Sequence, residues 1–157
     1  MLSDVAKQKI DREIAKFPAD QKQSAVMAAL AIVQDENGWL PTGLMDAVAH
    51  YLGMPSIAVY EVATFYNMYN LKPMGTHKIT VCTNLPCALS GGADAAEYLK
   101  HKLGVNWKEV TADGKFSVVE GECMGACADA PVLLINNKRM CSFMSNTKLD
   151  QLIAELK

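Results

Sequence analysis

Two pairs of cysteines constrain the fold of this chain more than any other feature. Four residues separate Cys82 from Cys87, three separate Cys123 from Cys127, and thirty-five lie between the pairs. Such a set can serve as structural disulfides, as redox groups or as metal ligands. The choice depends on the cellular compartment and on whether the fold brings the two pairs together.

The compartment is indicated by the first residues and by hydropathy. Residues 1–17, MLSDVAKQKIDREIAKF, alternate charge and apolarity and lack the apolar core of a secretion signal and the Arg/Ser bias of a transit peptide. No window approaches the ~18 apolar residues that a membrane-spanning helix needs. We therefore expect a cytoplasmic protein, in which cysteines bind metal or act in redox chemistry more often than they form structural disulfides.

Size and charge narrow the possible functions. The 157 residues suffice for a compact domain with a helical extension, and half of them are apolar. The net charge of -2 is spread along the chain without a basic block. We therefore expect no nucleic-acid partner.

The spacing of apolar residues predicts helices in residues 1–73. A first helix should begin near Ser3, present Ile10, Ile14 and Phe17 on one face, and end at Pro18. Three more are expected: Gln23 to Gln34 with a cap at Asn37-Gly38, Pro41 to Gly53, and a run from Pro55 that carries Val59, Val62, Phe65, Tyr66 and Met68. Together they predict an N-terminal helical bundle.

The hydrophobic period changes after the turn at residues 72–75, so residues 74–157 are expected to form a second domain. Strands are predicted at residues 78–83, 116–120, 131–136 and 138–143, with a hairpin turn at Asn136-Asn137. A helix is expected near residues 93–103, closed by Gly104. The last helix should be capped by Thr147, with Asp150 completing a capping box. Cys87 is expected in a loop.

This order of elements predicts a small mixed sheet. A right-handed crossover through the helix makes the first two strands parallel neighbours, and the later strand pair is antiparallel. The fold class is therefore α/β, a thioredoxin-like mixed-sheet domain preceded by a helical bundle. Because the loops after two parallel neighbours open at one edge of the sheet, Cys82 and Cys87 should meet Cys123 and Cys127 there.

The spacing within the pairs favours a cluster over a single ion. Structural zinc usually takes cysteine pairs with two residues between them, and neither pair has that spacing. A [2Fe-2S] cluster is wider, because each of its two irons takes two thiolates, so longer and unequal loops suit it.

The loops around the cysteines suit a buried negative charge. Four glycines should let backbone N–H groups approach the cluster: Gly91, Gly92, Gly121 and Gly125. Four apolar side chains are expected to exclude water: Val81, Leu85, Met124 and Ala126. The cluster becomes more negative when it is reduced. Because apolar surroundings disfavour that added charge, we expect a low reduction potential.

Three stretches of the chain resemble a known family. They are Tyr60-Glu-Val-Ala-Thr-Phe-Tyr66, Val81-Cys-Thr-Asn-Leu-Pro-Cys87 and Glu122-Cys-Met-Gly-Ala-Cys127, with Ala130-Pro131 just beyond. Over nearly its whole length the chain is similar to the [2Fe-2S] subunit, the 24-kilodalton or E subunit, of respiratory NADH:quinone oxidoreductase (complex I). Shorter thioredoxin-like ferredoxins lack the helical N-terminal region.

The resemblance implies that Cys82 and Cys87 bind one iron and that Cys123 and Cys127 bind the other. It also implies a partner subunit that binds FMN and NADH, further subunits of the peripheral arm, and a place on the inner face of the cell membrane without insertion. The chain would exchange single electrons with the flavin. The catalytic site would lie on the partner, since no G-x-G-x-x-G follows a strand here.

Several alternatives remain open at this point. Related subunits of NAD-linked hydrogenases and formate dehydrogenases share these motifs. Two rival functions are a structural zinc module and a thiol-disulfide oxidoreductase on the same fold. A dithiol oxidoreductase would be expected to carry a Cys-x-x-Cys pair, which is absent. The segment from Tyr60 to Tyr66 is either helical core or an interface with the flavoprotein.

Five further residues carry smaller expectations. Cys141 is expected to be a small buried residue and not a ligand. His50, His77 and His101 are expected at the surface or at helix ends. Thioredoxin-like folds place a cis proline at the start of the strand near residue 131, which makes a cis Ala130-Pro131 bond a hypothesis.

Overall fold

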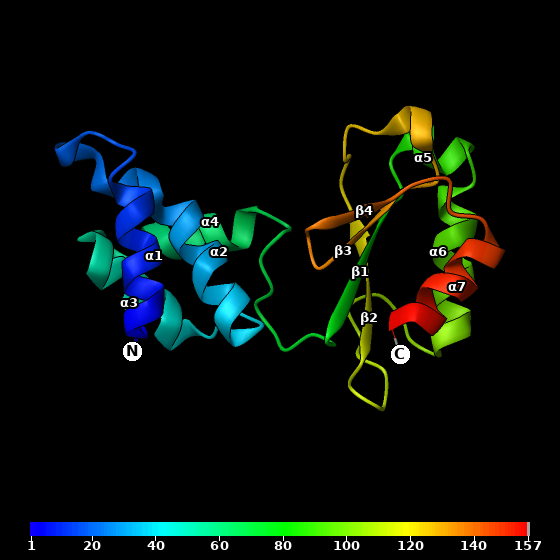
Figure 1. Ribbon diagram of the computed structural model, residues 1–157, viewed down its shortest axis with the longest axis horizontal. Helices are drawn as coiled ribbons and strands as arrows, with labels where there is room; N and C mark the ends of the chain where they lie inside the picture. Colours follow the sequence, from blue (N-terminus) through cyan, green and yellow to red (C-terminus); the bar gives the residue numbers. More distant parts are fainter. Residues whose placement is uncertain (157) are drawn as a thin grey trace. The chain divides into compact units, whose positions relative to one another are not determined.

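The structure, a computed structural model, describes residues 1–156. The chain forms two compact units, Met1–Pro73 and Met74–Lys157 (Figure 1). Each unit has its own hydrophobic core. Among the described residues, no helix is both long enough and apolar enough to cross a membrane.

The first unit is helical. Its elements are α1 (Asp4–Ile14), the 3-10 helix η1 (Ala19–Ala25), α2 (Val26–Asn37), α3 (Thr42–Leu52) and α4 (Ser56–Phe65). Gly38 and Gly53 end α2 and α3 in the left-handed conformation, with φ of 85° and 69°. The predicted helices are thus confirmed at nearly the expected positions.

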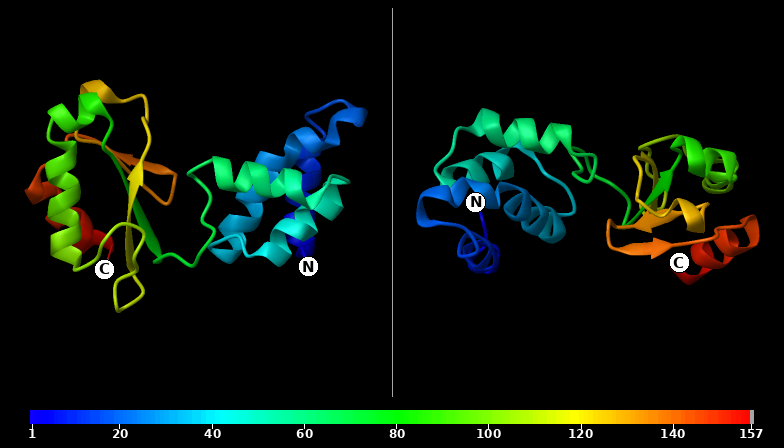
Figure 2. Two further views of the ribbon diagram at one scale, coloured as in Figure 1. Left: turned by 180° about the vertical axis from the view of Figure 1, so that it is seen from behind. Right: turned by 90° about the horizontal axis from the view of Figure 1, so that it is seen from above.

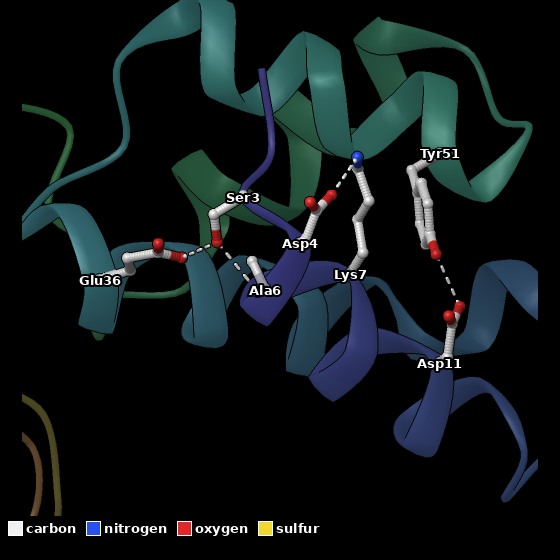
Figure 3. A network of polar contacts seen from close by, with 7 residues as sticks. All are labelled: Ser3, Asp4, Ala6, Lys7, Asp11, Glu36 and Tyr51. Carbon is white, nitrogen blue, oxygen red and sulfur yellow. Dashed lines mark hydrogen bonds and ion pairs between the residues drawn. The ribbon is translucent and has the colours of Figure 1, made fainter.

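Hydrogen bonds between polar side chains link α1 to α2 and α3 (Figure 3). The Ser3 hydroxyl accepts a hydrogen bond from the Ala6 N–H at 2.9 Å, which caps α1, and donates to the Glu36 carboxylate at 2.9 Å. At the other end of α1, the Tyr51 hydroxyl donates to Asp11 at 2.7 Å. These contacts fix α1 against α2 and α3, while Ile10 is fully buried in the core.

Three details of this unit differ from the sequence prediction. The second helix is preceded by the separate 3-10 helix η1, so its regular part begins at Val26. Phe17 lies beyond the end of α1 and is exposed. The chain leaves α1 through a tight turn, in which the Phe17 N–H donates to the Ile14 carbonyl. Tyr66 and Met68 follow the end of α4 and do not extend it.

The second unit is a sheet with helices on one face. Its elements are β1 (His77–Cys82), α5 (Leu85–Leu89), α6 (Gly92–Leu103), β2 (Phe116–Gly121), the 3-10 helix η2 (Cys127–Asp129), β3 (Leu133–Ile135), β4 (Arg139–Cys141) and α7 (Asn146–Leu156). The strand order is β2-β1-β3-β4. β1 and β2 are parallel, whereas β3 is antiparallel to both β1 and β4. The predicted mixed sheet is confirmed.

Side chains along each strand point alternately to the two faces of the sheet, and the hydrophobic core of this unit lies on one of these faces. Alternate strand residues such as Ile79, Val118 and Leu133 point to one face, where they pack against Leu99 of α6 and Leu152 of α7. Figures 1 and 2 show both helices on this face of the sheet. The parallel pair β1 and β2 is joined by α6, as a crossover connection requires.

Three local predictions in this unit need correction. Cys87 lies in the short helix α5 and not in an irregular loop. The third strand is shorter than expected and begins at Leu133. The last helix begins at Asn146 and is capped by Ser145 and not by Thr147, and the Asp150 carboxylate accepts a hydrogen bond from the Tyr98 hydroxyl at 2.8 Å instead of completing a capping box.

Candidate metal centre

Cys82 and Cys87 form the buried half of the site. Cys82 is the last residue of β1, and Cys87 lies in α5 directly after it. Both side chains are almost completely inaccessible, at 0% and 1% exposure. Pro86 near the start of α5 suits a first helical turn and lets this short helix form.

Cys123 and Cys127 form the exposed half of the site. Cys123 follows the end of β2, and Cys127 begins η2. Both thiols are exposed to solvent. The left-handed conformation of Gly125, with φ of 70°, turns the chain between them and directs the Gly125 N–H toward the Cys123 sulfur at 3.4 Å.

Packing confirms that the two cysteine segments meet at one edge of the sheet. Cys82 and Cys87 share a small apolar cluster with Val132, and Met124 and Ala126 from the other segment pack against it. Figure 1 shows α5 and η2 together at this edge. The two segments thus meet at one edge, as the parallel strands predicted.

Electrostatics link all four thiols. The pKa of the Cys87 thiol is raised to about 11, chiefly because burial disfavours the thiolate. A hydrogen bond with Cys82 and the negative charges of Cys82, Cys127 and Cys123 as thiolates add to this rise. Among the described residues, no three His, Cys, Asp or Glu side chains are grouped closely enough to hold a single metal ion.

The apolar residues expected around the site divide into two groups. Met124 and Ala126 cover Cys82 and Cys87, as predicted. Val81 faces the opposite side of the sheet and belongs to the core under α6 and α7, because successive strand residues alternate. Leu85 is 71% exposed, so the expectation that it excludes water is wrong for the described chain.

Two of the four glycines make room for close neighbouring protein atoms. A Cβ on Gly92 would lie 2.8 Å from the carbonyl oxygens of Cys82 and Cys87. A Cβ on Gly121 would lie 2.5 Å from the Thr80 methyl carbon. Gly91, with φ of 91°, precedes α6 as its N-cap. Gly125 alone of the four predicted glycines donates a hydrogen bond to a cysteine sulfur among the described residues.

The residues expected to lie outside the site do so. Cys141 is buried in β4, as predicted. His50 and His101 are exposed in the last turns of α3 and α6, also as predicted. His77 instead begins β1, half-buried, with its ring 5.6 Å from that of Phe116. The Ala130-Pro131 bond is cis, which confirms the hypothesis.

Sequence reasoning missed four polar residues that flank the cysteines. Thr83 and Asn84 directly follow Cys82, and they donate hydrogen bonds to Glu120 and Glu122, which precede Cys123. The one feature of the sequence that could have pointed to these four residues is that they lie within three residues of Cys82 or Cys123.

Comparison with known proteins identifies the family. A family model described as thioredoxin-like [2Fe-2S] ferredoxin matches residues 10–157. The chain belongs to this family. Its cofactor is a [2Fe-2S] cluster, and the residues present fit that group: four free thiols on two segments that pack together, an N–H donor to the Cys123 sulfur, and an apolar cover over the buried pair.

Several curated proteins are similar to this ferredoxin-family chain. The E subunit of NADH-quinone oxidoreductase from Rickettsia bellii is 50% identical over 125 residues, covering 79% of this chain and 75% of that protein. The same subunit from Rickettsia felis is 44% identical over 143 residues, covering 90% and 85%. The mitochondrial NADH dehydrogenase [ubiquinone] flavoprotein 2 of Dictyostelium discoideum is 41% identical, covering 82% of this chain and 53% of that protein. The family resemblance seen in the sequence is confirmed.

A solved structure supports the fold. The NAD+-reducing [NiFe]-hydrogenase in its H2-reduced state contains a chain that matches with a TM-score of 0.68 at 21% identity. The match covers 81% of the present chain and 22% of the hydrogenase chain, so this chain spans about a fifth of its length.

Proposed function

We propose that this ferredoxin-family chain is the electron-transfer subunit of an NADH:quinone oxidoreductase, with a [2Fe-2S] cluster bound by Cys82, Cys87, Cys123 and Cys127. One observation carries the ligand assignment: Met124 and Ala126, from between Cys123 and Cys127, pack on the buried pair Cys82 and Cys87. When bound, the cluster accepts and releases one electron at a time.

The chain's own residues prepare the site for such a group. Thiols must lose their protons to bind iron, so binding of the cluster releases protons from the cysteines that hold it. The Gly125 N–H offsets negative charge on the Cys123 sulfur. Val132 excludes water behind Cys82 and Cys87. Exclusion of water favours a low reduction potential, whereas the N–H donated to the sulfur stabilises the more negative reduced state and raises that potential.

We propose that electrons enter and leave on the side of Cys123 and Cys127. These two residues are exposed, whereas Cys82 and Cys87 are covered by protein. A partner's flavin can therefore approach the site most closely from that side. The partner is taken to be the subunit that binds FMN and NADH, alongside other subunits of the peripheral arm, and this chain is not assigned a catalytic site of its own.

The aromatic segment of α4 is proposed to contact that partner. One side of the segment is core: Val59 is fully buried, and the Tyr60 hydroxyl donates to the Asp46 carboxylate of α3. The other side exposes Phe65 at 80% and Ile57 at 64%. Contiguous exposed apolar patches mark interaction sites. Both alternatives for this segment thus apply, each to one face of the helix.

The names of the relatives support membership of a respiratory complex. We propose that the chain lies in the cytoplasm, peripheral to the inner face of the cell membrane through the complex. The domain roles follow from the same reasoning: residues 1–73 contribute partner contacts, and residues 74–157 hold the cluster.

An electron-transfer experiment tests this function. The chain is reduced with dithionite, freed of excess reductant, and mixed without oxygen with the oxidised FMN-binding subunit. Two reduced chains should deliver the two electrons that, with two protons, convert one FMN to its reduced form, seen as bleaching of the flavin absorption. A chain with an intact cluster that leaves the flavin oxidised would contradict the proposal.

A further inference from the structure

Two side-chain hydrogen bonds cross between the cysteine segments. The Thr83 hydroxyl donates to the Glu120 carboxylate at 2.7 Å. The Asn84 amide donates to the Glu122 carboxylate at 3.3 Å. Both donors directly follow Cys82, and both acceptors lie just before Cys123. The bonds therefore span the same gap between β1 and β2 that a cluster held by these cysteines must span.

The backbone leaves this gap without other hydrogen bonds. The parallel pairing of β1 with β2 ends at Cys82 and Gly121. Within the described residues, no backbone hydrogen bond joins residues 83–91 to residues 122–127. The Asn84–Glu122 bond therefore links residues 83–91 to residues 122–127, and the Thr83–Glu120 bond links the first of these segments to the end of β2.

The far end of the second segment is held differently. The Asp129 carbonyl accepts the Phe143 N–H at 2.8 Å, and the Pro131 carbonyl accepts the Met144 N–H at 3.0 Å. Backbone bonds thus fix the chain just after Cys127. The Cys123 end depends on side chains.

We propose that Thr83 and Asn84 are positioning residues that set the separation of Cys82 and Cys123 by holding the Glu120 and Glu122 carboxylates. This inference rests on the proposed set of cluster ligands. Bonds to charged acceptors are stronger and more directional than neutral ones. Because the pairs are exposed, their loss should change overall stability little. The consequence should instead appear in how long the cluster stays bound and in its spectrum.

Position and charge can be separated by substitution. Thr83→Val and Asn84→Ala remove the donors, whereas Thr83→Ser keeps the hydroxyl. Glu122→Gln keeps an acceptor for Asn84 but removes a negative charge next to Cys123. We expect Glu122→Gln to keep the cluster as long as the wild type does, with a reduction potential shifted to a more positive value.

The test measures the loss of visible absorption after a chelator is added to the anaerobic, cluster-loaded chain. The double variant Thr83→Val/Asn84→Ala should lose its cluster about tenfold faster than wild type, and its EPR signal after reduction should broaden. Thr83→Ser should behave as wild type. The matched control is Tyr98→Phe, which removes one hydrogen bond of 2.8 Å between α6 and α7 and should leave the rate unchanged.

Two results would overturn the inference: a double variant that keeps its cluster as long as wild type, or a Tyr98→Phe variant that loses it equally fast. Failure of the ligand set itself is recognised separately, because Cys123→Ala would then retain the cluster.

Discussion

Cys82 pairs with Gly121 at the last step of the parallel β1 and β2 ladder. Cys123 lies two residues beyond that step, so both cysteine segments leave the sheet at the same edge. Side chains that follow neighbouring parallel strands converge at such an edge. This relationship brings the two segments that carry the cysteine pairs, distant in sequence, to the same edge of the sheet.

The ligand set predicts a sharp difference between two cysteine substitutions. Cys123→Ala should abolish binding of the cluster, because one iron then lacks a thiolate. Cys141→Ala should keep the cluster, since Cys141 is buried in β4 and lies outside the group of thiols that interact with Cys87. Acid-labile sulfide and iron per chain measure the outcome. Equal cluster content in both variants would show that the ligands are assigned wrongly.

Gly92 should tolerate no side chain. Its Cβ would lie 2.8 Å from two carbonyl oxygens, so Gly92→Ala must displace the backbone that carries Cys82 and Cys87. We expect the free energy of unfolding to fall by about 1–3 kcal/mol. In the matched control, Gly43→Ala, the Cβ meets nothing within 4 Å in α3, and stability should rise by about 0.5–1 kcal/mol. Urea denaturation compares the two, and a Gly92→Ala chain as stable as wild type would contradict the packing.

The helices, the parallel pair β1 and β2 and the antiparallel later strands were predictable from the sequence, because they depend on strong local signals. The position of β3 beside β1 was not predicted, because it depends on tertiary contacts. Gly38 and Gly53 ended their helices where expected. The errors arose where tertiary contacts decide. The Ser145 hydroxyl caps α7 by accepting the Lys148 N–H at 3.4 Å, while Asp150 bonds Tyr98 of α6.

Short helices were the other feature that could not be predicted from the sequence. The helix α5 has five residues, too few for a hydrophobic period to be visible in sequence. The exposure of Leu85 could not be predicted for the same reason, since its orientation depends on that helix. The bonds of Thr83 and Asn84 to the two carboxylates require the register of β1 with β2, which composition does not specify.

Tyr69 predicts how the helical unit responds to alkali. Burial raises the pKa of its phenol to about 12, and its hydroxyl donates to the Met27 carbonyl at 2.9 Å. The pKa of this phenol is about 10 in the unfolded chain and about 12 in the folded chain. The resulting contribution to folding stability is fully present below about pH 10 and is lost as pH rises through about 12, because the unfolded chain ionises first. Tyr69→Phe should cost about 1 kcal/mol at pH 7 through the lost hydrogen bond.

The difference in stability between wild type and Tyr69→Phe should therefore shrink between roughly pH 10 and 12. Urea denaturation at neutral and alkaline pH, followed by circular dichroism, gives both values. A difference that stays constant over this range would argue against the burial of the phenol.

The exposed face of α4 predicts a loss of partner binding without a loss of cluster. Phe65→Ser removes a large apolar side chain that is 80% exposed, so it should weaken co-purification with the FMN-binding subunit while cluster content stays unchanged. Val5→Ser, at a side chain of α1 that is 58% exposed, is the matched control and should co-purify normally. If both variants bind the partner as wild type does, this face of α4 is not the interface.

The most direct test of the account is the metal content and EPR spectrum of the anaerobically purified chain. We predict about two irons and two acid-labile sulfides per chain and, after reduction with dithionite, a spin-one-half signal with an average g value just below about 2. The same preparation of Cys123→Ala should give no such signal. A colourless wild-type chain that holds one zinc ion and no sulfide would contradict the central claim.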